Sequence, residues 1–176
     1  MSNNHKHWGN LKTYFPFIRG GSPCIANRKE GIAIFNPILL AEDNANDIEL
    51  TLAAFKENKL ANRVDVVRDG TEAMDYLLCR GKYADRPAEM PVVILLDIKM
   101  PKKSGIEVLQ EIKQNPDFNK IPVVMLTLSD MEQDICDSYE LGVNAYVVKP
   151  VDFVDFAKAV KILGLFWSVL NRTPSK

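Results

Sequence analysis

Cysteine and long apolar runs are scarce in this chain. Its three cysteines, Cys24, Cys79 and Cys136, are odd in number and show no paired spacing, which argues against a disulfide-stapled secreted fold and favours a reducing, cytoplasmic setting. No apolar stretch approaches the roughly 18 residues that a membrane span requires. The run from Tyr14 to Ile18 is short and broken by Pro16, so it lacks the apolar core of a secretory signal.

Histidine is also rare, and internal repeats and low-complexity tracts are absent. His5 and His7 lie in a Gly- and Asn-rich terminus without a further metal ligand beside them, a setting typical of solvated polar residues. Residues 1–37 carry five basic side chains and only Glu30 as an acid, although the whole chain has a net charge of −1. A basic tail can contact nucleic acid or a membrane, but scattered charges without a repeat favour a solvated extension.

The chain of 176 residues suits one folded domain with a sizeable core. Residues 1–36 contain glycine and proline without sustained apolar periodicity, and we expect a flexible N-terminal extension there. The folded domain is expected to span residues 37–170 and to be followed by a short tail at residues 171–176. This organisation leaves no room for an attached output domain such as a DNA-binding helical unit.

Four apolar runs each end on polar residues suited to phosphate chemistry. The runs and the residues that follow them are Ile38 to Ala41 before Glu42 and Asp43, Val92 to Leu96 before Asp97, Val123 to Leu126 before Thr127, and Ala145 to Val148 before Lys149. Continuous runs rich in valine, isoleucine and leucine are typical of strands buried on both faces, which occur in parallel sheets covered by helices. A shorter, partly polar strand is expected from Arg63 to Val67.

Helical patterns separate the expected strands. Asn44 or Asn46 is expected to cap a first helix that buries Ile48, Leu52 and Phe55, and Asp69 a second helix that buries Ala73, Met74, Leu77 and Leu78. The capping boxes Ser104 to Glu107 and Ser129 to Glu132 are expected to start the third and fourth helices. Asp152 is expected to start a last helix that runs to about Leu170. Gly142 is expected to end the fourth helix in a left-handed conformation. This alternation, with right-handed crossovers, predicts an α/β sandwich.

The polar residues at the strand ends are expected to meet. Because ligands of open α/β sheets bind beyond the carboxyl ends of the strands, three carboxylates, a hydroxyl and an ammonium converge at one edge. Glu42, Asp43 and Asp97 repel one another when left alone, and a divalent cation is their natural neutraliser. Mg²⁺, or Mn²⁺ in its place, suits an all-oxygen ligand set. The sequence therefore predicts a metal and phosphoryl site.

This ordered set of motifs resembles the receiver domain of two-component response regulators. The motifs are the acidic pair after the first strand, Asp97 followed by Ile98-Lys99-Met100-Pro101 and Gly105, then Thr127, and then Lys149-Pro150. The resemblance covers residues 36–170 and implies a flavodoxin-like, doubly wound sheet of five parallel strands in the order 2-1-3-4-5, flanked by five helices. The stretch Leu77 to Tyr83 with Arg86-Pro87 resembles the stand-alone receivers that are paired with phytochrome-type histidine kinases.

The resemblance implies that Asp97 is a phosphoacceptor. Its carboxylate attacks a phosphohistidine of a partner histidine kinase and forms an aspartyl phosphate, while the Thr127 hydroxyl and the Lys149 ammonium stabilise the transferring group. The chain then signals by conformational change and protein contacts. It catalyses only its own phosphorylation and dephosphorylation, so we do not expect an enzyme that turns over an external substrate.

The resemblance also implies a ligand set for the metal. Asp43 and Asp97 contribute carboxylate oxygens, Lys99 contributes its backbone carbonyl, and Glu42 orients a water. Lys99 departs from the common pattern because its side chain places a second cation beside the site.

Three further roles concern the neighbours of the reacting groups. In the family, the hydroxyl at Thr127 moves toward the phosphoryl group and an aromatic residue, here Tyr146, turns inward behind it; the alternative for Tyr146 is simple packing at the strand end. Pro150 is implied to follow a cis peptide bond that aims Lys149 into the site. Leu128 stands where a small residue is usual, and its bulk is expected to crowd access to Asp97.

Two rival functions remain open from the sequence. A haloacid-dehalogenase-type phosphatase also uses an aspartate after a parallel strand, but it needs a second aspartate two positions later, where this chain has Lys99. A degenerate receiver would bind partners without phosphorylation. The intact set of Asp97, Thr127 and Lys149 counts against that reading.

The last helix predicts a homodimer. Its expected core face consists of Phe153, Phe156, Val160, Leu163, Trp167 and Leu170. Further apolar positions widen this face, namely Val154, Ile162, Leu165, Phe166 and Val169. A contiguous apolar patch usually marks an interface, and related receivers pair through the face made by the fourth helix, fifth strand and fifth helix. The alternative is that the helix end folds over its own domain or frays.

Overall fold

A computed structural model describes residues 36–87, 89–128, 132–149 and 153–165 of the protein. Its strands form one parallel sheet in the order β2-β1-β3-β4-β5. They are β1 Ile38–Ala41, β2 Val64–Val67, β3 Val93–Leu96, β4 Val123–Thr127 and β5 Ala145–Val148. The expected doubly wound fold and its strand order are confirmed.

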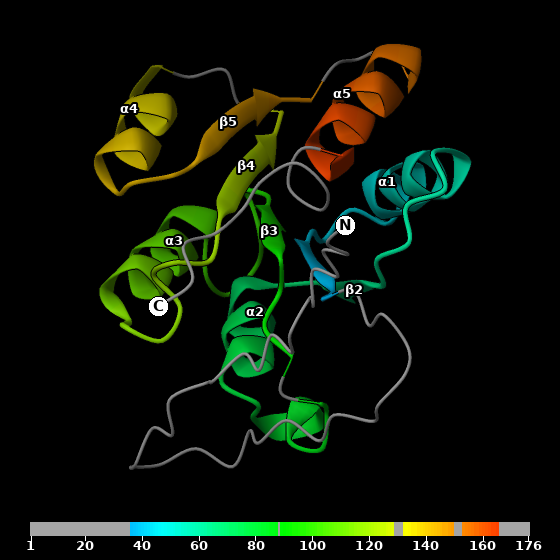
Figure 1. The fold of residues 1–176 in the computed structure, drawn as a ribbon. Helices are drawn as coiled ribbons and strands as arrows, with labels where there is room; N and C mark the ends of the chain where they lie inside the picture. The colour runs from blue at the N-terminus through cyan, green and yellow to red at the C-terminus, as the bar shows by residue number, and fades with distance from the viewer. Residues whose placement is uncertain (1–35, 88, 129–131, 150–152, 166–176) are drawn as a thin grey trace, which may run out of the picture.

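The helices of the described residues alternate with the strands and cover both faces of the sheet (Figure 1). They are α1 Ala45–Glu57, α2 Gly70–Leu77, α3 Gly105–Gln114, α4 Glu132–Glu140 and α5 Phe153–Leu165, with the short 3₁₀ helix η1 Gly81–Tyr83 after α2. α1 and α5 lie side by side on one face, and α2, α3 and α4 lie on the other. Over these ranges, no helix is both long and apolar enough to cross a membrane.

The side chains of the strands alternate between two apolar layers. β1, β3 and β4 are buried along their whole length, as their continuous apolar runs predict. The layer that includes residues of α2 and α3 contains Leu39, Ile94, Met125, Leu77 and Leu109, and the layer that includes residues of α1 and α5 contains Leu40, Leu95, Leu126, Phe55 and Phe156. The sheet is therefore packed between these two apolar layers.

The buried stripe of α1 differs from the expected one. Ile48 and Phe55 are buried as expected, but Leu52 is 36% exposed and Thr51 is buried in its stead at 1%. The Thr51 hydroxyl donates to the carbonyl oxygen of Asp47 at 2.7 Å. Because this bond satisfies the hydroxyl within the helix, burial of Thr51 leaves no unpaired polar group, and Leu52 is left facing solvent.

The helix start and stop signals are found where they can be compared. Asn44 rather than Asn46 caps α1, Asp69 caps α2, and Ser104 and Glu107 form the capping box of α3. Gly142, just after α4, has a φ of 82°, which confirms its left-handed conformation. The expected signals at Ser129 and Asp152, and the end of the last helix near Leu170, lie outside the described residues.

Candidate functional site

The carboxyl ends of β1, β3, β4 and β5 carry the polar residues that the sequence singled out. Hydrogen bonds continue the ladder past the strands, since the Asp97 N–H donates to the Ala41 carbonyl at 3.0 Å and the Lys149 N–H donates to the Thr127 carbonyl at 2.7 Å. Glu42, Asp97, Thr127 and Lys149 are all buried, with exposed fractions between 1% and 6%. The fold therefore brings these residues together at one edge of the sheet, as the sequence predicts.

Three carboxylates at this edge form an acidic cluster. One oxygen from each of Glu42, Asp43 and Asp97 lies within 4.8 Å of the others, and only Asp43 is exposed. Oxygen ligands at this spacing fit a hard divalent cation such as Mg²⁺ or Mn²⁺, so the residues present suit the expected metal. The Lys99 N–H donates to Asp97 Oδ2 at 2.7 Å, whereas the metal role of the Lys99 carbonyl remains a prediction.

The Lys149 ammonium lies inside this arrangement of acids. Its Nζ is 2.5 Å from Glu42 Oε2, 2.8 Å from Asp47 Oδ2 and 3.1 Å from Asp97 Oδ1. The Lys149 side chain is 5% exposed, so water screens these attractions weakly. The ammonium therefore neutralises part of a strongly negative site from within.

Burial and pairing have opposite effects on the pKa of each of the two partners, Glu42 and Lys149. Burial raises the pKa of Glu42 above its ordinary value, and the hydrogen bond from Lys149 offsets only part of this rise. Burial alone lowers the pKa of Lys149, but the hydrogen bonds to Asp47 and Glu42 and the charge of Asp97 outweigh burial, so its pKa is raised. Lys149 is consequently a cation at neutral pH, held among the carboxylates of the strand ends.

Asp47 is the member of the site that the sequence analysis missed. It lies in the first turn of α1 rather than at a strand end, and it brings a third carboxylate to the Lys149 ammonium, beside Glu42 and Asp97. The available signal was its spacing, since Asp47 follows the acidic pair and the capping Asn44 closely in sequence. Without the fold, however, an acid in a first turn is explained well enough by the helix dipole.

The loop after Asp97 is held by close backbone packing. The Gly105 N–H donates to the Ile98 carbonyl at 2.9 Å, and a Cβ on Gly105 would lie 2.1 Å from the Asp97 carbonyl oxygen. Lys102 has a φ of 66° and its Nζ donates to Asp69 Oδ2 at 2.6 Å. Glycine in the motif is therefore required by contact with the strand end, and the loop is tied to the start of α2.

The residues proposed for switching have different surroundings. Thr127 and Tyr146 share one face of the sheet, because Tyr146 pairs with Met125 and side chains alternate along β4. Tyr146 is half-buried against the layer of α2 and α3. Leu128 is 66% exposed, so its side chain lies in solvent rather than in the core, and its effect on access to Asp97 remains a prediction. Pro150, and with it the expected cis peptide bond, lies outside the described residues.

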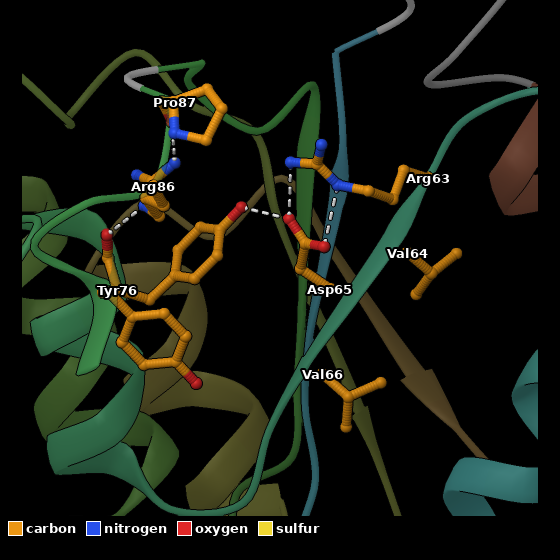
Figure 2. Close-up of a pocket in the computed structure, with 8 residues that line it drawn as sticks. Arg63, Val64, Asp65, Val66, Tyr76, Arg86 and Pro87 are labelled. Atoms are coloured by element: carbon orange, nitrogen blue, oxygen red, sulfur yellow. Dashed lines mark hydrogen bonds and ion pairs between the residues drawn. The ribbon is translucent and has the colours of Figure 1, made fainter.

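A separate hollow of about 340 Å³ lies at the outer edge of the sheet, along β2. Figure 2 shows the residues around it, which are Arg63, Val64, Asp65, Val66, Tyr76, Tyr83, Arg86 and Pro87. Its carboxylate, Asp65, already accepts hydrogen bonds from Arg63 and from the Tyr76 hydroxyl. Because its carboxylate is already paired and no strand-end acid lines it, we regard the strand ends as the functional site.

Comparison with known sequences identifies relatives over most of the chain. A family model described as the response regulator receiver domain matches residues 38–161. Response regulator Rcp1 of Synechocystis sp. is 45% identical over 130 residues, which cover 74% of this chain and 87% of that protein. The probable methanogenesis regulatory protein FilR2 of Methanothrix harundinacea is 36% identical over 137 residues, covering 78% of this chain and 86% of that protein.

Solved structures share the fold over the same part of the chain. The Mn²⁺-bound form of Rcp1 has a TM-score of 0.74 and 42% identity, covering 80% of this chain and 99% of that one. The phosphorylated cyanobacterial phytochrome response regulator RcpA has a TM-score of 0.74, 43% identity and the same 80% and 99% coverage. The bacteriophytochrome response regulator AtBRR has a TM-score of 0.65 and 57% identity, covering 78% of this chain and 99% of that one.

Proposed function

The chain belongs to the response regulator receiver domain family, and from this membership we propose that Asp97 is its phosphoacceptor. The family function, acceptance of a phosphoryl group in two-component signalling, is the function of this chain. The observation that supports Asp97 as the acceptor is its shared position. It follows the central strand β3 and contributes both to the acidic cluster and to the ion pairs of Lys149.

The residues around Asp97 suit the transfer of a phosphoryl group from a kinase phosphohistidine. One Asp97 oxygen bonds to phosphorus, the phosphorus–nitrogen bond breaks, and the histidine nitrogen leaves with the electron pair. The Lys149 ammonium, 3.1 Å from Asp97 Oδ1, is close enough to stabilise negative charge on the phosphoryl oxygens. The Thr127 hydroxyl, at the end of the neighbouring strand β4, is proposed to do the same.

Receiver domains bind a divalent metal, and the acidic cluster of this chain has matching ligands. We propose Mg²⁺ as the resident ion, with Mn²⁺ as a substitute. Asp43 and Asp97 would bind through carboxylate oxygens, Lys99 through its carbonyl and Glu42 through a water. A metal held there supplies positive charge that neutralises the acids and the transferring group.

Signalling is proposed to follow from a change at Thr127 and Tyr146, which share one face of the sheet. The histidine kinase partner is proposed to be of the phytochrome type. Two observations support this choice: the similar proteins RcpA and AtBRR are phytochrome and bacteriophytochrome response regulators, and the loop that suggested this subgroup is tied to the domain by Arg86. We place the protein in the cytoplasm, where the kinase takes its phosphoryl group from ATP.

We further propose that a second copy of this chain binds the face made by α4, β5 and α5. Exposed apolar side chains lie on these elements, namely Tyr139 at 54%, Val148 at 41% and Ile162 at 66% exposed, and apolar surface of this kind favours an interface. Analytical ultracentrifugation of the wild type and an Ile162→Glu variant tests this proposal. A wild type that is monomeric at tens of micromolar, with and without a phosphoryl donor, would overturn it.

The phosphoacceptor assignment is tested by intact-mass measurement after incubation with acetyl phosphate and Mg²⁺. We expect the wild type to gain the mass of one phosphate only when the metal is present, and Asp97→Asn to gain none. A phosphate on the variant would show that Asp97 is not the acceptor. Steady release of inorganic phosphate from an external ester would instead support the phosphatase reading, which the Lys99 position disfavours.

A further inference from the structure

Lys149 contacts one carboxylate that does not belong to the acidic cluster, and this contact separates the acids that could bind a metal from the acid that binds only the ammonium. Two of its three acidic partners, Glu42 and Asp97, are cluster members. The third partner, Asp47 at 2.8 Å, lies on α1 and is not one of the three acids that converge at the candidate metal site. Asp47 therefore binds the ammonium without being a ligand of that site.

A divalent cation in the acidic cluster would compete with Lys149 for the same oxygens. It attracts the Glu42 and Asp97 carboxylates and repels the ammonium, because like charges at a few ångströms in a buried site interact strongly. Asp47 is then the partner that Lys149 retains. We propose that Asp47 is a positioning residue that holds the Lys149 ammonium beside Asp97 when the acidic cluster is occupied by metal; this inference rests on the proposed function.

Asp47 is itself held in place by its neighbours on α1. Its N–H donates to the capping oxygen of Asn44 at 3.4 Å, and its carbonyl accepts from the Thr51 hydroxyl at 2.7 Å. Thr51 is 1% exposed, and its hydrogen bond to Asp47 is the reason that a hydroxyl is tolerated at this buried position of the helix. A carboxylate on such a fixed turn is pre-organised, so it orients Lys149 with little loss of conformational entropy.

A purely structural role for Asp47 has a different signature. An acid in the first turn stabilises a helix through the macrodipole, and that effect does not depend on Lys149. Glu49 provides a matched control, because it is an exposed acid on the same helix and is not one of the acids that contact Lys149. Glu49→Gln removes the same charge from α1 while leaving the neighbours of Lys149 unchanged.

The experiment compares wild type, Asp47→Asn and Glu49→Gln by timed intact-mass measurement with acetyl phosphate at saturating Mg²⁺. We expect Asp47→Asn to slow labelling on the order of tenfold, since an orienting charge-assisted hydrogen bond is lost, and Glu49→Gln to label at the wild-type rate. In a calorimetric titration with Mg²⁺ alone, the dissociation constant of Asp47→Asn should stay within about threefold of the wild-type value, because Asp47 is not a ligand and its partly exposed charge is screened by solvent.

A double-mutant cycle with Lys149→Met shows whether Asp47 acts through the lysine. In that background, Asp47→Asn should cause no further loss of labelling rate. If labelling of Lys149→Met is too slow to time, the same cycle is measured by urea unfolding without metal, where Asp47→Asn should destabilise only the protein that keeps Lys149.

Three results would overturn the inference. They are an Asp47→Asn protein that is labelled at the wild-type rate, a Glu49→Gln protein that is labelled as slowly as Asp47→Asn, and an Asp47→Asn substitution whose effect is the same with and without Lys149. Failure of the proposed function looks different, because the wild type itself would then gain no phosphate that depends on Asp97.

Discussion

The protein contains two clusters of charged side chains, and they differ in how completely their charges are matched. The strand-end cluster comprises Glu42, Asp43, Asp47, Asp97 and Lys149. The edge cluster comprises Arg63, Asp65, Tyr76 and Arg86. The first cluster sets one lysine against four acids, whereas the second has two arginines and one carboxylate. Only the strand-end cluster therefore has acids in excess of its cations.

The edge cluster is closed by direct contacts (Figure 2). Asp65 accepts from Arg63 Nε at 2.9 Å and from the Tyr76 hydroxyl at 2.5 Å. The Arg86 guanidinium lies 3.9 Å from the centre of the Tyr76 ring, and its Nε donates to the Tyr76 carbonyl at 2.8 Å. These contacts pin the loop of η1 to β2 and α2. We therefore expect the edge cluster to stabilise the fold and the strand-end cluster to carry the phosphoryl chemistry.

Removal of the Lys149 charge should produce the largest effect on stability. Lys149→Met leaves buried carboxylates without their cation, so we expect a loss of about 3 kcal/mol in unfolding free energy without metal. Mg²⁺ should then stabilise the variant more than the wild type, since the ion no longer competes with an ammonium. Urea unfolding with and without Mg²⁺ measures both effects.

Lys158 offers a control for this experiment, because its ion pair with Asp155 is exposed at 66% and 62%. Lys158→Met should change stability little. A Lys149→Met protein as stable as the wild type in the absence of metal would contradict the strand-end account.

Arg86→Ala should have the next largest effect, and on stability alone. The variant loses the ring contact with Tyr76 and hydrogen bonds to the carbonyls of Tyr76, Pro87 and Glu89, so we expect a loss of about 2 kcal/mol. Labelling of Asp97 by acetyl phosphate should keep its wild-type rate. Arg80 is an exposed arginine of the same loop, so Arg80→Ala is the matched control. Slower labelling in Arg86→Ala but not in Arg80→Ala would contradict a purely structural role of the edge cluster.

Tyr76→Phe should have a smaller effect that depends on pH. Burial, followed by the hydrogen bond to Asp65, raises the pKa of Tyr76 from 10.0 to about 12. A folded-state pKa raised in this way gives stability that is present below pH 10.0 and is lost as the pH rises toward 12. The variant should lose about 1 kcal/mol at pH 7 and show a shallower loss above pH 10.0 in urea unfolding. If the unfolding free energies of the wild type and Tyr76→Phe fell equally with rising pH, the Tyr76 hydroxyl would not be the group that titrates.

Deletion of residues 1–36 should have the smallest effect. This segment lacks apolar periodicity, so we expect less than about 1 kcal/mol of change in stability and unchanged labelling of Asp97. Thermal unfolding of the full chain and the shortened chain measures this difference. A larger loss would show that the segment packs on the receiver domain.

The sequence predicts the sheet and most of the site because both depend on local pattern. Continuous apolar runs specify the buried strands, and parallel pairing brings the residues after them to one edge, so Glu42, Asp97, Thr127 and Lys149 meet without further information. Asp47 was missed because its partner is distant in sequence and its role depends on how α1 packs. The exchange of Leu52 for Thr51 in the buried stripe was also missed, since a hydrophobic pattern does not account for a hydroxyl that bonds to its own helix.

The most direct test of this contrast is an amide chemical-shift titration of isotope-labelled protein with Mg²⁺ and beryllium trifluoride, a phosphoryl mimic that binds to carboxylates. We predict large shifts for Lys99 and Lys149, whose N–H groups bond to Asp97 and Thr127, and negligible shifts for Asp65 and Arg86. Equal shifts in both clusters, or shifts confined to the edge cluster, would contradict the assignment of the strand ends as the phosphoryl site.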